Sequence, residues 1–192
     1  MNFEKIKQIM LITLKWLLIC CLIGIFSGSA SALFLVSLEF VTQVRIQNTW
    51  IIWLLPFGGL FIGYLYFISD SKIAKGNNLL LEEYNKPERK IPFLMAPLVL
   101  LSTLITHLFG GSAGREGTAV QMGGAIADVC FSIFKLNHSE RRTLIILGIS
   151  AGFASIFGTP LAGALFALEI IFFSRINFRS IVLSFLVAYI AY

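Results

Sequence analysis

Long apolar runs, separated by short charged segments, make up most of this sequence. The longer runs are Trp16–Leu38, Trp50–Ile68, Ile91–Phe109 and Ala119–Phe134, and shorter ones follow at residues 143–157, 161–173 and 181–192. A helix needs about 20 apolar residues to cross the hydrocarbon core of a bilayer. The pattern therefore predicts an all-α polytopic membrane protein in which residues 1–192 form a single transmembrane domain.

The first 68 residues are expected to form a basic lead-in followed by a helical hairpin. Residues 1–15 suit a short helix at the cytoplasmic membrane surface, or an extension of the first span. The first span has a face of small residues that permits close helix packing: Gly24, Ser27, Gly28, Ala30 and Ala32. Residues 39–48 are expected to form a polar turn before the second span.

Basic residues set the expected orientation in the membrane. The segment Asp70–Lys90 is rich in charge, and the connector at residues 137–142 is flanked by Lys135 and ends in Arg141 and Arg142. Because cytoplasmic loops carry an excess of Lys and Arg, both segments are predicted to be cytoplasmic, and the N-terminus with them. Arg175 and Arg179 mark a third basic connector.

Composition excludes several classes of protein. The sequence is 57% hydrophobic and 13% charged, whereas soluble domains are about 45–50% apolar. Its basic residues do not form the patch that nucleic acid requires. Cys20, Cys21 and Cys130 lie in apolar runs without metal-ligand spacing. We expect no nucleic acid, no metal and no other cofactor.

Two glycine-containing breaks interrupt the apolar runs. Gly110–Gly114 precede Arg115 and Glu116, which places charge at membrane depth, where it must pack inside protein or face a polar cavity. We expect a discontinuous helix whose second half begins near Arg115. The unpaired N–H groups of such a start can hold an anion. The sequence thus predicts an anion pathway gated by Glu116, and a second break at Gly158–Pro160. Pro97 is expected to kink its span.

The segment Gly114–Gly124, followed by Gly152–Gly163, resembles the CLC family of chloride channels and anion/proton antiporters. The family's Gly-Ser-Gly-Ile-Pro signature aligns with Gly76–Leu80, and its Gly-Lys/Arg-Glu-Gly-Pro signature with Gly114–Thr118. Asn77 in place of serine and Thr118 in place of proline are similar to the fluoride/proton antiporter branch. The resemblance implies an anion site formed by these residues: Gly76, Asn77, Asn78, Gly114, Arg115, Gly117 and Thr118.

The same resemblance implies a function and an assembly. Glu116 would compete with the anion when ionised and move away when protonated, giving fluoride export coupled to proton import in the cell membrane. Family members are homodimers built from two inverted repeats of discontinuous, tilted helices. This chain matches the first repeat, so we expect it to be inactive unless another chain supplies the second. A chloride channel, a chloride/proton antiporter and a non-transporting partner subunit stay open as alternatives.

Several single residues have a structural alternative. Asn77 could be a helix N-cap, and Arg115 could neutralise a buried acid. Glu169 is expected to be such an acid, while Ile170 stands where chloride-type antiporters carry a proton-relay glutamate. Gly110–Gly114 also matches the Gly-x-Ser-x-Gly pattern of hydrolases, with Ser112 as nucleophile and His107 nearby. The signal is weak without the strand-to-helix turn that this chemistry needs, so we do not expect an enzyme.

Overall fold

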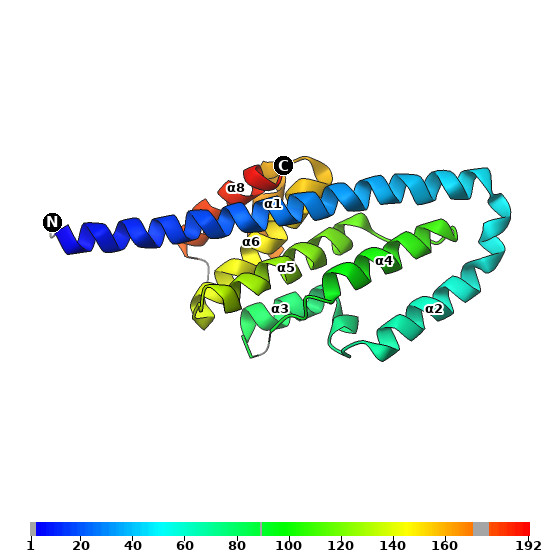
Figure 1. The fold of residues 1–192 in the computed structure, drawn as a ribbon, viewed down its shortest axis with the longest axis horizontal. Coiled ribbons are helices and arrows are strands. Elements are labelled where there is room, and N and C mark those ends of the chain that lie inside the picture. The colour runs from blue at the N-terminus through cyan, green and yellow to red at the C-terminus, as the bar shows by residue number, and fades with distance from the viewer. Residues whose placement is uncertain (1–2, 89, 171–176) are drawn as a thin grey trace.

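Helices form all the regular structure of the part of the chain that the computed structural model describes, residues 3–88, 90–170 and 177–192 (Figure 1). The α-helices are α1 (Phe3–Gln47), α2 (Leu55–Ile68), α3 (Asn77–Asn85), α4 (Met95–Leu108), α5 (Arg115–Ile133), α6 (His138–Phe157), α7 (Pro160–Ile170) and α8 (Phe178–Ala191). Short 3₁₀ helices, η1 (Thr49–Leu54) and η2 (Ile73–Lys75), precede α2 and α3. The predicted all-α class is confirmed.

Helix α1 is one continuous element of 45 residues along the whole molecule (Figure 1). At 1.5 Å per residue it is about 68 Å long, more than twice the thickness of a hydrocarbon core of about 30 Å. Residues 3–15 therefore extend the first span rather than forming a separate helix. The predicted polar turn at residues 39–48 is wrong. Residues 33–47 contain no glycine or proline to end the helix, and Gln43 donates to Glu39 within it at 2.8 Å.

Among the residues that the structure describes, two segments are long and apolar enough to cross a membrane, Glu4–Gln47 and Thr49–Ile68. The second begins with η1, whose Trp50 and Trp53 are 61% and 82% exposed, as suits side chains at a membrane interface. The kink predicted at Pro97 is wrong. Pro97 is the third residue of α4 and so lies in its first turn. The backbone N–H groups of the first turn have no partner within the helix, so the N–H that proline lacks is not missed there.

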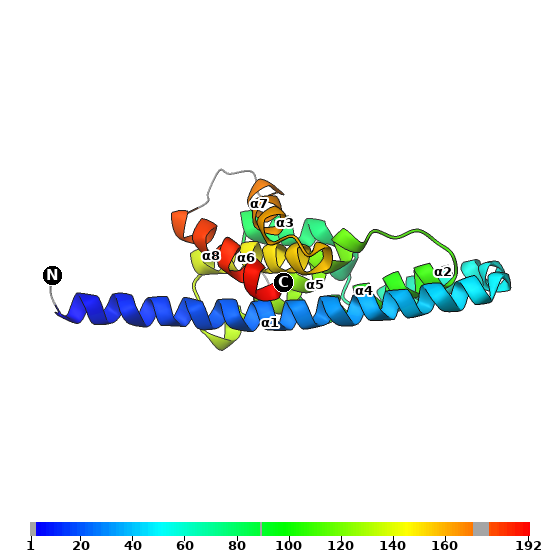
Figure 2. The same cartoon turned by 90° about the horizontal axis from the view of Figure 1, so that it is seen from above.

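Helices α5 and α6 form the most extensive helix pair and lie at the centre of the fold (Figure 2). Their backbones touch because glycine stands at the crossing. A Cβ on Gly123 would collide with the carbonyl oxygen of Gly148, and a Cβ on Gly152 with that of Ala119. Membrane helices associate through close backbone contacts of this kind, because lipid tails are as apolar as the helix surfaces and burial alone gives little driving force. The small residues of α1 act similarly, since Gly28 lies against the carbonyl of Ala191 on α8.

The helix ends of α6 follow local sequence signals. Asn137 and Glu140 form a capping box, with the Glu140 N–H donating to Asn137 at 2.9 Å, so residues 138–142 belong to α6 and not to the predicted connector. The helix ends at Gly158, whose φ is 65°, and α7 begins at Pro160. This second break was predicted correctly. Arg179 lies in α8, and Arg175 lies outside the described residues.

The crossing of α5 and α6 gives a test of the packing. Gly152→Ala is expected to destabilise the chain, because the new methyl group can be accommodated only if the two backbones move apart. Gly59→Ala on α2 is the matched control, since no atom of the described residues outside the local helix backbone lies within 4 Å of its new Cβ. Alanine also favours a helix by about 1 kcal/mol over glycine. Thermal unfolding in detergent should give a lower midpoint for the first variant only. Equal unfolding midpoints for the two variants would contradict the close backbone packing of α5 against α6.

Candidate anion site

The first candidate feature is the start of α5. Helix α4 ends at Leu108, the chain turns through Gly110 at φ 83°, and Gly114 in extended conformation precedes Arg115. No side chain caps this helix start. Its first N–H groups therefore have no partner within the helix and carry the positive end of the helix dipole. The break and the new helix start at Arg115 are as predicted.

Glu116 lies in the first turn of α5 and is exposed. Its carboxylate turns back toward the helix start, because Oε2 lies 3.0 Å from the position that a Cβ on Gly114 would occupy. Negative charge is favourable there. Arg115 is also exposed, and among the described residues neither it nor Glu169 forms an ion pair. The expectation that Glu169 is a buried acid is wrong, since it too is exposed.

The second candidate feature is the start of α3, which faces the start of α5. Gly76 has a φ of 58° that favours glycine, and Asn77 is the first residue of the helix. Asn77 Nδ2 lies 3.5 Å from the position of a Cβ on Gly117. Asn77 is not the N-cap, because Gly76 holds that place and no side chain caps the helix. The structure thus brings Gly76, Asn77 and Gly117 together, while Asn78 is exposed.

Thr118, which replaces the proline of the family signature, is 3% exposed. Its hydroxyl group lies 2.7 Å from that of Thr103 on α4 and donates to the carbonyl of Gly114 at 3.1 Å. The side chain therefore ties α4 to α5 behind the helix start. His107 Nδ1 lies 2.9 Å from the carbonyl oxygen of Thr103. Ser112 stands between two helices, whereas a nucleophile elbow joins a strand to a helix.

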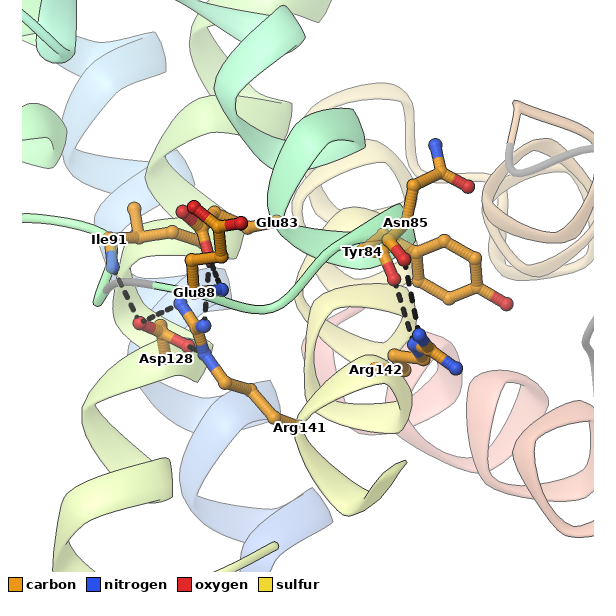
Figure 3. Close-up of polar contacts among 8 residues, drawn as sticks. All are labelled: Glu83, Tyr84, Asn85, Glu88, Ile91, Asp128, Arg141 and Arg142. Atoms are coloured by element: carbon orange, nitrogen blue, oxygen red, sulfur yellow. Dashed lines mark hydrogen bonds and ion pairs between the residues drawn. The ribbon is translucent and has the colours of Figure 1, made fainter. Parts of the chain in front are cut away.

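A buried charge cluster, made of Glu83, Asp128 and Arg141, joins α3, α5 and α6 (Figure 3). Arg141 is 1% exposed and donates twice to Asp128, from Nε at 2.6 Å and Nη2 at 3.0 Å. It also donates from Nη1 to Glu83 at 2.9 Å. Asp128 accepts the backbone N–H of Ile91 at 2.7 Å. Such bidentate, charge-assisted bonds are strong and fix the geometry of their partners.

Arg142 adds a second tie to α3. It donates from Nε to the carbonyl of Tyr84 at 2.9 Å and from Nη2 to that of Asn85 at 3.1 Å (Figure 3). These carbonyls belong to the last turn of α3, where a cation is favourable. Helix α3 has nine residues, so its two ends are only about 12 Å apart. The cluster at its C-terminal end therefore helps to fix the position of Asn77 at the other end.

Sequence reasoning did not identify this cluster. A usable signal was present, because Asp128 is the only charge in a long apolar run and such a charge needs a partner. The sequence did not show which of the basic residues would supply it. A connector was expected at Arg141 and Arg142, whereas the capping box places both residues in α6.

Several known proteins are similar to this chain in sequence. Residues 66–192 match the family model described as voltage gated chloride channel. The chain belongs to the CLC family. A chloride/fluoride channel protein from Pseudomonas syringae pv. tomato is 49% identical over 167 residues, which cover 87% of this chain and 37% of that CLC protein. An H(+)/Cl(-) exchange transporter, ClcA, from Cronobacter sakazakii is 34% identical over 172 residues, covering 80% and 36% respectively.

A solved structure shows the same CLC fold. The crystal structure of a CLC-type fluoride/proton antiporter matches 100% of this chain and 47% of its own, with a TM-score of 0.86 and 32% identity. The predicted CLC fold and the likeness to the fluoride/proton antiporter branch are thereby confirmed. This chain spans less than half the length of each of these relatives. CLC proteins are membrane proteins.

The buried charge cluster can be tested by removing its cation. Arg141→Met is expected to lower stability by about 3–5 kcal/mol, because Asp128 stays buried without its bidentate partner. Lys75→Met is the matched control, since it removes a half-exposed ion pair with Glu82 that contributes less than about 1 kcal/mol. Thermal unfolding in detergent measures both. An equal loss of stability in the two variants would contradict the stabilising role of the buried charge cluster.

Proposed function

We propose that this chain forms one wall of a fluoride pathway and that the complete transporter exports fluoride in exchange for protons. The observation that carries the proposal is the meeting of two helix starts. The first turn of α3, with Asn77, faces the first turn of α5, with Gly117 and Glu116 beside it. Unpaired N–H groups and two helix dipoles directed at one place favour an anion there.

Asn77 supports fluoride over chloride. Fluoride is small and strongly hydrated, so a site must replace its water with short, strong hydrogen bonds. The NH₂ group of Asn77 offers two N–H donors, whereas the serine of the usual family signature offers one hydroxyl. Two relatives with fluoride in their names, the chloride/fluoride channel protein of P. syringae and the solved fluoride/proton antiporter, agree with this assignment.

Glu116 is proposed as the gate that couples fluoride to protons. Its carboxylate turns back to the start of α5, the same place where the anion would bind. Two negative charges at one helix start repel one another. The ionised carboxylate and the anion would therefore exclude one another, and protonation of Glu116 would allow the anion to enter. Gly114, Arg115 and Thr118 would serve through the backbone of this helix start.

The remaining parts of the proposal concern assembly. The transporter is a homodimer in the cell membrane, with several spans, a cytoplasmic N-terminus and two repeats in each subunit. Residues 1–192 supply the first repeat. In the experiments below, the complete transporter is this chain assembled with a second half. That second half comes from the same gene or, if the gene does not encode one, from the P. syringae relative.

Fluoride transport can be measured directly. Proteoliposomes containing the complete transporter, with potassium fluoride at the same concentration inside and outside, are expected to release fluoride when the outside is made acidic, so that the proton gradient drives the release. Glu116→Gln should abolish this proton-driven transport, because the side chain can no longer be ionised. A fluoride electrode follows the release, and Glu39→Gln, on the exposed end of α1, is the matched control that should keep it. Chloride release in preference to fluoride would instead support a CLC-type chloride exchanger.

The need for a second half is a separate prediction. Proteoliposomes that contain residues 1–192 alone are expected to transport no fluoride, whereas liposomes with both halves transport it. Assembly is checked by size-exclusion chromatography before the flux is measured. Transport by residues 1–192 alone at the rate of the assembled protein would contradict the proposal that they form only part of the pathway wall.

A further inference from the structure

Gln121 lies beside the candidate anion site, and neither the sequence signatures nor the proposed function uses it. It follows Gly117 by four residues on α5, so the two share one face of the helix. Gly124 continues that face and lies against Leu80 of α3. Gln121 is thus a long polar side chain between two glycines, on the face that meets α3.

The amide of Gln121 lies at the start of α3. Its Nε2 is 3.4 Å from the position of a Cβ on Gly76 and 3.9 Å from that of a Cβ on Gly117. The Nδ2 of Asn77 is 3.5 Å from this second position. Two side-chain amides therefore flank one small space between α3 and α5. The side chain of Gln121 is half-buried, and rotation about its χ angles can change the distance between the amides.

Asn77 has an unsatisfied atom in this place. Its Oδ1 is buried and has no hydrogen-bond partner among the described residues. A buried acceptor without a partner is costly, and a carbonyl oxygen directed at an anion would repel it. Asn77 can serve an anion only when its NH₂ group faces the anion and its Oδ1 faces a donor. The amide of Gln121 is a donor within reach of the same space.

We propose that Gln121 is a positioning residue, whose N–H donates to Asn77 Oδ1 and so directs the NH₂ group of Asn77 toward the anion. The inference rests on the proposed fluoride site and extends it to selectivity. Gln121 acts through Asn77 and does not itself bind the anion. Its effect should therefore fall on the preference for fluoride over chloride and should disappear when Asn77 is replaced.

The test uses Gln121→Met in the complete transporter, because methionine keeps the length of the side chain without its donor. We expect the ratio of fluoride to chloride flux to fall about tenfold, the order of magnitude of a hydrogen bond that holds a ligand group in place. Gln121→Glu should reduce the ratio further, since a carboxylate accepts from the NH₂ group of Asn77 and turns it away. Gln43→Met, on the exposed surface of α1, is the matched control and should leave the ratio unchanged.

A double-mutant cycle separates positioning from other roles. In the Asn77→Ser background, Gln121→Met should change the flux ratio no further. An equal loss in that background would overturn the inference, because Gln121 would then act independently of Asn77. Equal loss of fluoride and chloride flux, with a lower unfolding midpoint, would also overturn it, since that marks a purely structural residue. If the unmodified transporter carries no fluoride, it is the proposed function that fails.

Discussion

The paired charges of Arg141 and Asp128 are the constraint on which the rest of this structure depends. Burying an ion is costly, and it is tolerated only when its hydrogen bonds are complete. Asp128 receives two N–H groups from Arg141 and one from the backbone of Ile91, and Arg141 reaches Glu83 as well. These bonds join α3, α5, α6 and the segment before α4. They therefore fix how these segments lie relative to one another at the cluster.

Different interactions fix the two ends of helix α3. Its last turn binds Arg141 and Arg142 through charge and hydrogen bonds. Its other end approaches α5 because Gly124 leaves room for the side chain of Leu80, and there the side chain of Asn77 lies beside Gly117. Since the helix is short and rigid, the two attachments together place its first turn against the first turn of α5. The proposed anion site is a consequence of that placement, and the proposed role of Gln121 depends on it too.

The sequence predicted features that depend on local chemistry and missed those that depend on distant partners. The helix starts at Arg115 and Pro160 could be predicted because glycine and proline act on the adjacent backbone. The turn expected at residues 39–48 was wrong, since polar residues without a helix breaker continue a helix. The partner of Asp128 is 13 residues away and the contact of Asn77 with α5 is 40 residues away. Spacing alone could not give either one.

The central claim is that Glu116 and fluoride exclude one another at the start of α5. Calorimetric titration of the complete transporter with fluoride, in buffers of different ionisation enthalpy, measures the protons taken up as the anion binds. We predict uptake of about one proton for each fluoride when Glu116 starts ionised, and none in Glu116→Gln, because the carboxylate must be neutralised before the anion can share its site. Fluoride binding without proton uptake in the unmodified protein would contradict the account.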